Sequence, residues 1–74
     1  MIIYSVFRNN KEINKSLRIY VTGTSAFESI NIIEAEIWKL FMRYHKNHGG
    51  IIINTHLFIR DAINIGYEIK ELIL

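Results

Sequence analysis

The sequence predicts a small protein of the α+β class, and three observations support that prediction. The chain has 74 residues, of which 50% are hydrophobic, so it can close one core and has no room for a second domain. Its first third holds one stretch of β-forming apolar residues and a second stretch that alternates apolar and polar residues with the period of a strand. Two later stretches repeat apolar residues every three or four positions, as helices do. We expect residues 1–74 to form one domain with the element order ββαβα.

Two strands that pair as a β-hairpin are expected at the start of the chain. Residues 2–7 are apolar at almost every position and rich in β-forming residues, which is typical of a central strand. Residues 16–22 alternate, with Leu17, Ile19 and Val21 on the face that we expect to be buried. The polar, asparagine-rich connection over residues 9–15 suits an antiparallel turn.

The stretch YVTGTSAFE, residues 20–28, leads from the second strand into a helix, where phosphate-binding loops occur in other folds. Such a loop needs several glycines and a lysine, whereas this stretch has Gly23 alone. Ser25 and Glu28 have the spacing of a capping box, in which each side chain bonds the amide of the other residue. We therefore predict a capped helix start here and no phosphate site.

A long helix is predicted over residues 26–47 from one apolar stripe. Gly49 and Gly50 follow it, and glycine readily adopts the left-handed conformation that ends helices. The stripe consists of residues three and four positions apart, namely Ala26, Ile30, Ile33, Ile37, Leu40, Phe41 and Tyr44.

The last third of the chain allows two interpretations. Residues 51–53 are three isoleucines, which predict a short third strand beside the first one, in the sheet order 2-1-3. From Asn54 or Thr55 onward, apolar residues recur in helical phase to the C-terminus, and we favour a helix to the end of the chain. The alternative ends the helix at Gly66 and makes a fourth strand from residue 67 onward.

The sequence offers little catalytic or metal-binding chemistry. It has no cysteine, which excludes disulfides, thiolate zinc sites and cysteine nucleophiles. His45, His48 and His56 are a weak metal signal, because histidines near a helix C-terminus interact favourably with the helix dipole. A chain this short rarely builds a cleft that excludes water. We expect no enzyme activity, no catalytic residues, no cofactor and no metal.

Charge and hydropathy guide the expectation for location and source. The formal net charge of +2 is too mild to require a nucleic acid or a membrane as partner. No stretch approaches the roughly 18 uninterrupted apolar residues of a membrane-spanning helix, and the N-terminus lacks the pattern of a signal peptide. We expect a cytoplasmic protein with no membrane partner. Its abundant isoleucine and asparagine suggest an AT-rich genome, hence the hypothesis of a phage or mobile-element origin.

Apolar residues in excess of one core indicate an interaction surface on the helices. Large apolar side chains on an exposed helix flank are typical of protein interfaces. We therefore predict a small regulatory protein that binds an unidentified protein partner and forms a homodimer. The residues expected to form this surface are Ile32, Trp38, Met42 and Leu57.

Nucleic-acid binding is the alternative function. An aromatic residue on a sheet can stack on bases while nearby cations hold phosphates. The residues that would make these contacts surround the hairpin and share a strand face, namely Arg8, Lys11, Lys15, Arg18 and Tyr20. The cluster is small, and the sequence carries no known nucleic-acid-binding motif.

Overall fold

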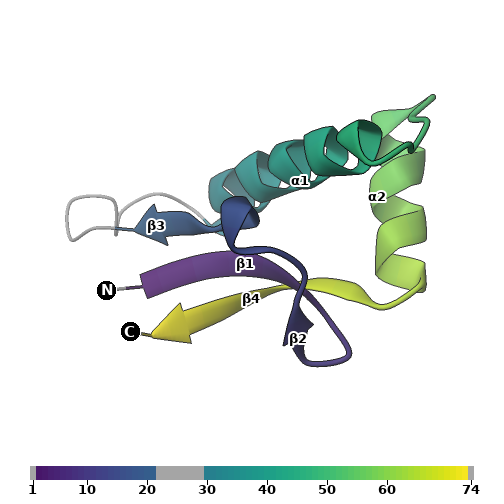
Figure 1. Cartoon of the computed structure of the whole chain (residues 1–74). Helices are drawn as coiled ribbons and strands as arrows, with labels where there is room; N and C mark the ends of the chain where they lie inside the picture. Colours follow the sequence, from purple (N-terminus) through teal and green to yellow (C-terminus); the bar gives the residue numbers. More distant parts are fainter. Residues whose placement is uncertain (1, 22–29, 74) are drawn as a thin grey trace.

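The structure is a computed structural model that describes residues 2–21 and 30–73. The elements in chain order are β1 (Ile2–Arg8), β2 (Lys11–Glu12), the 3-10 helix η1 (Lys15–Leu17), β3 (Ile19–Val21), α1 (Ile30–Asn47), α2 (Thr55–Asn64) and β4 (Tyr67–Ile73). In this part of the chain, α1 lies over one face of an antiparallel sheet, and α2 runs across the end of the sheet where β4 begins (Figure 1). The α+β class is confirmed. The predicted capping box of Ser25 and Glu28 lies outside the described residues.

Strand β1 is the centre of the sheet, as its apolar sequence predicts. β4 pairs antiparallel with β1 from Ile2 opposite Ile73 to Arg8 opposite Tyr67. β2 and β3 share the other edge of β1, with η1 between them. One edge of β1 is therefore covered by a continuous strand, and the other by two short pieces.

The predicted N-terminal hairpin forms, but its turn is tighter and its second strand shorter than the sequence indicated. The strand predicted from residue 16 starts only at Ile19, because residues 15–17 form η1. Asn9 and Asn10 both have positive φ, at 54° and 63°, which is the geometry of a two-residue type I′ turn. Asparagine tolerates this conformation better than most residues. The chain then pairs back at once as β2, within the stretch that we expected to be a plain connection.

The fourth-strand alternative is confirmed, and the favoured helix to the C-terminus is wrong. α2 ends at Asn64, and Gly66 follows with a φ of 101°. The Gly66 amide donates to the Ile63 carbonyl at 3.1 Å, which closes the helix end. This left-handed turn reverses the chain, so that β4 pairs along a full edge of β1.

Residues 51–53 do not form the predicted third strand. They are the short link between α1 and α2, because α2 begins directly after them with Asn54 as its N-cap. The Asn54 side chain accepts the Leu57 amide at 3.1 Å. β4 and the pair β2 and β3 already occupy both edges of β1, which leaves the three isoleucines no strand edge there.

The core lies between the helices and the sheet face that carries Tyr4 and Val6. The opposite face of β1 carries Ile3, Ser5 and Phe7, which are also buried. On this second face, the Lys70 amine lies 5.9 Å from the centre of the Phe7 ring. The buried residues of the core are Val6, Leu17, Val21, Ile33, Ile37, Trp38, Phe41 and Ala62.

Candidate functional site

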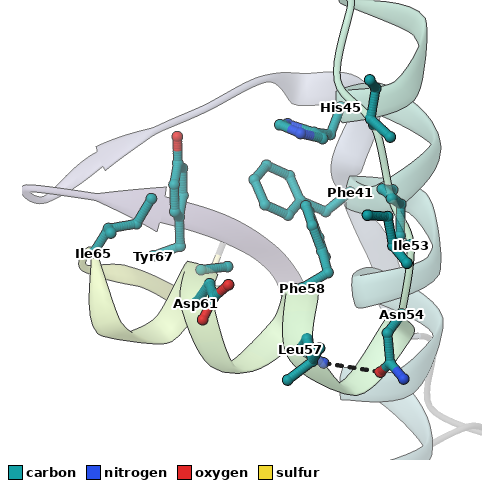
Figure 2. Close-up of a pocket in the computed structure, with 12 residues that line it drawn as sticks. Phe41, His45, Ile53, Asn54, Leu57, Phe58, Asp61, Ile65 and Tyr67 are labelled. Atoms are coloured by element: carbon teal, nitrogen blue, oxygen red, sulfur yellow. Dashed lines mark hydrogen bonds between the residues drawn. The ribbon is translucent and has the colours of Figure 1, made fainter.

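An apolar cavity lies where α1, the link of residues 51–54, α2 and the start of β4 meet (Figure 2). We call it the α2 cavity. Its volume is about 420 Å³, within the range that binding pockets occupy. Side chains from three elements and the link line it, so its shape depends on the way the helices and β4 pack together.

Aromatic rings build the inner wall of the α2 cavity. The ring centre of Phe41 lies 5.6 Å from that of Phe58 and 4.9 Å from that of Tyr67. These rings come from α1, α2 and β4 in turn. Aromatic pairs at such separations attract one another beyond the area that they bury. This wall is therefore a continuous apolar surface built from three elements.

The end of α1 sets the position of a further wall residue, His45. The Gly50 amide donates to the His45 carbonyl at 2.9 Å, and Gly49 has a φ of 87°, as in a Schellman motif. The His45 ring packs directly on Gly50, where a Cβ atom would collide with it. The same ring lies 5.1 Å from Phe58. The glycine pair thus allows the histidine to close one side of the cavity.

Exposed isoleucines and a leucine form the rim of the α2 cavity. Ile51 and Ile53 are 84% and 94% exposed, and Leu57 and Ile65 are about half exposed. Figure 2 shows Ile53, Leu57 and Ile65 around the aromatic wall. Contiguous exposed apolar surface of this kind usually marks a binding site.

Few polar groups face the α2 cavity. Asn54 uses its side-chain oxygen to cap α2. The Asp61 carboxylate lies 3.4 Å from the Arg60 guanidinium, where both side chains are exposed. No lysine or arginine is among the described residues that line the cavity. Its chemistry therefore suits an apolar side chain better than a charged ligand.

The structure does not bring the predicted helix surface together in one patch. Trp38 is 8% exposed and lies in the core, with its ring 6.0 Å from that of Phe41, so its assignment to an exposed surface is wrong. The stripe that faces the sheet is wide enough to include it. Ile32 is exposed and Met42 half-buried, and the two are about 15 Å apart along α1. Of the four residues predicted to form the interaction surface, only Leu57 lines the α2 cavity.

Ile51 and Ile53 are surface residues, whereas their sequence predicts a buried strand. Their β-branched side chains favour a buried strand, and the prediction rested on this strand propensity. It gave too little weight to the position of the residues between two helix ends. The signal that identifies them correctly is their context. They stand between two glycines that end one helix and an asparagine that caps the next, so they form a link too short to reach a sheet edge.

Among the predicted nucleic-acid contacts, Arg18 is held by an ion pair. Its Nε and Nη2 atoms donate to the Glu12 carboxylate at 2.8 and 2.7 Å. This hydrogen bonding lowers the pKa of Glu12 and raises that of Arg18. A guanidinium bound in this way has fewer donors left for a phosphate.

The other predicted contacts are spread around the hairpin and β3. The Arg8 guanidinium lies 5.2 Å from the centre of the Tyr67 ring. Lys11, Lys15 and Tyr20 have exposed side chains. Tyr20 shares the sheet face that points away from the helices, whereas Lys11 belongs to β2 at the hairpin end.

Residues 2–21 and 30–73 hold no group of three side chains that suits a metal ion. Instead, the His48 ring nitrogen Nδ1 lies 2.8 Å from the Tyr44 carbonyl oxygen, within the end of α1. In the same described ranges, no helix is long and apolar enough to cross a membrane. Comparison of the chain with protein-family models, with curated proteins and with solved structures finds no match.

Proposed function

We propose that this chain is a small non-enzymatic interaction protein, which binds a protein partner at the α2 cavity and thereby regulates that partner. The observation that supports this most is the exposure of Ile51 and Ile53 beside an aromatic wall. Full burial of an isoleucine side chain contributes about 1.5 to 3 kcal/mol. A partner that buries these two side chains would gain binding free energy from their burial.

The partner that fits the α2 cavity presents a large apolar side chain from an amphipathic helix or loop. A volume of about 420 Å³ accommodates such a side chain, and the exposed rim contacts its neighbours. A phosphate group finds no lysine or arginine among the described lining residues. The proposal therefore favours a protein over a nucleic acid at this site.

The experiment that tests the proposal is affinity capture of the chain from an extract of its native host, followed by mass spectrometry. We expect a protein that is retained after nuclease treatment and lost from the double variant Ile51→Ser/Ile53→Ser. Both side chains are exposed, so the double variant should fold. Ile32→Ser is the matched control on α1, and it should keep the partner.

Three outcomes would contradict this assignment. Loss of the partner from Ile32→Ser alone would place the interface on α1, as the sequence-based prediction has it. Retention of the partner by the double variant would show that the α2 cavity is not the binding surface. A partner that disappears after nuclease treatment would favour the nucleic-acid alternative.

A further inference from the structure

The outer edge of β4 is a second surface with the properties of a protein interface. β4 pairs with β1 in one unbroken register, and among the described residues no strand pairs with its other edge. An unpaired edge presents a row of backbone N–H and C=O groups that can pair with another strand.

β4 carries one feature that usually protects an edge strand, the charged side chains of Glu68, Lys70 and Glu71, but it is long, unbroken and free of proline. Proteins shorten such strands, interrupt them with bulges or place proline in them. The opposite edge of the sheet is protected in this way, since β2 has two residues, β3 has three, and η1 separates them. β4 has seven residues, contains no proline and shows no bulge in its register with β1.

We propose that β4 pairs antiparallel with β4 of a second copy of this chain, about a two-fold axis at Ile69. A two-fold axis normal to the sheet makes two identical strands antiparallel. Ile69 then lies opposite the partner's Ile69 on the helix-covered face. On the other face, Glu68 lies opposite the partner's Lys70, and Lys70 lies opposite the partner's Glu68.

The charges of β4 are complementary to themselves in this register. Within one copy, the Lys70 amine already lies 3.6 Å from the Glu68 carboxylate, and the Asn10 side chain accepts from that amine at 2.7 Å. The two-fold axis adds a second Glu68 and Lys70 pair, so that the four charges alternate in sign around a square. Opposite charges across strands stabilise a sheet.

Neighbouring registers lack this complementarity. An axis at Glu68 places two glutamates opposite each other, an axis at Lys70 places two lysines opposite each other, and an axis at Glu71 again places two glutamates together. Axes nearer the ends of β4 pair fewer residues. The register at Ile69 joins residues 67–71 of both copies with no like charges directly opposite.

Self-association through β4 and partner binding at the α2 cavity can be tested separately. Glu68 and Lys70 share the sheet face of Phe7, which points away from the helices. Neither residue lines the α2 cavity. Variants at these two positions therefore leave the cavity lining unchanged, and failure of one proposal does not decide the other.

Charge exchange is the first test of the β4 dimer. Glu68→Lys and Lys70→Glu should each weaken self-association roughly tenfold or more, because each places like charges opposite each other. An equimolar mixture of the two variants should dimerise again, since each charge then meets its opposite. Light scattering after size-exclusion chromatography measures the mass, and Glu36→Lys on α1 is the control with the same charge change.

Cross-linking is the second test, and it needs neither charge variant to fold. The chain has no cysteine, so Ile69→Cys introduces a single thiol. Directly opposite residues in an antiparallel pair have Cα atoms about 4.5 to 5.5 Å apart, which a disulfide spans. Glu71→Cys is the control, because its copies would stand about 13 Å apart in this register. Mild oxidation should give a covalent dimer of the first variant and little of the second.

The proposal is overturned if the unmodified chain is monomeric at its highest soluble concentration. It is equally overturned if both charge variants remain dimeric, or if the two variants are folded by circular dichroism and their mixture fails to dimerise. Cross-linking of Glu71→Cys in preference to Ile69→Cys would replace the register with another one.

Discussion

The side chains of Arg18 and Glu12 form a doubly hydrogen-bonded ion pair on the sheet face that points away from the helices. The two contacts measure 2.8 and 2.7 Å, and the side chains are only 17% and 15% exposed. Glu12 ends β2, and Arg18 immediately precedes β3. The pair therefore ties together the two short strands that share one edge of β1.

This ion pair predicts a loss of stability in acid. Hydrogen bonds from Arg18 lower the pKa of Glu12 below its ordinary value of 4.5. A carboxyl with a lowered pKa in the folded state stabilises the fold above pH 4.5 and loses that contribution as the pH falls through the folded-state pKa. Glu12→Gln should unfold more easily than the unmodified chain at pH 7, and the two should converge in acid. Thermal unfolding at several pH values measures this, and a constant difference across the range would contradict it.

The Schellman motif at the end of α1 predicts a specific cost for Gly49→Ala. The φ of 87° at this residue is unfavourable for a side chain with a Cβ atom, although the space around it is open. We expect a loss of about 1 kcal/mol or more in unfolding free energy. Gly49→Asn is the matched control and should lose less, because asparagine tolerates this conformation. Equal losses in urea titrations of both variants would argue against backbone strain as the cause.

The burial of Trp38 predicts that it supports the fold. Trp38→Ala should lower the unfolding free energy by about 3 to 5 kcal/mol, as truncation of a buried aromatic residue does. Ile53→Ala removes an apolar side chain that is almost fully exposed, and it should leave stability nearly unchanged. Urea titration compares the two variants. A stable Trp38→Ala protein would restore this residue to the list of surface candidates.

The basic residues of the hairpin should contribute little to the binding of the protein partner. The variant Lys11→Gln/Lys15→Gln should keep the protein partner, because neither lysine lines the α2 cavity. Binding of the unmodified chain to RNA or DNA should be weak at physiological salt. Affinity for a mixed-sequence RNA, measured at low and high salt, checks both statements. A strong affinity that falls steeply with salt and disappears in this lysine variant would establish the nucleic-acid alternative.

The parts of the fold that the sequence predicts are those where local pattern and tertiary position agree. Ile19 and Val21 lie in β3, as their alternation predicts, whereas Leu17 at the start of the predicted strand belongs to η1. The stripe from Ile30 to Tyr44 places α1, since one wide apolar face packs on the sheet. In these stretches the local period coincides with the face that the core buries.

The C-terminal half is predicted less well, because two local patterns coincide there. Ile65, Ile69 and Leu72 are in phase with a helix, yet Tyr67 and Ile69 also alternate with Glu68 and Lys70 as in a strand. What decides between them is long-range, namely an edge of β1 that β4 covers. Residues 51–53 also have a high strand propensity, but both edges of β1 are already occupied, so they form no strand there.

The measurement that tests the central claim most directly is hydrogen–deuterium exchange of the chain with and without its captured protein partner. Binding at the α2 cavity should slow exchange over residues 51–65, which include the rim and α2, and leave residues 11–20 of the hairpin unchanged. Slower exchange confined to the hairpin, or to the start of α1 around Ile32, with residues 51–65 unaffected, would contradict the account.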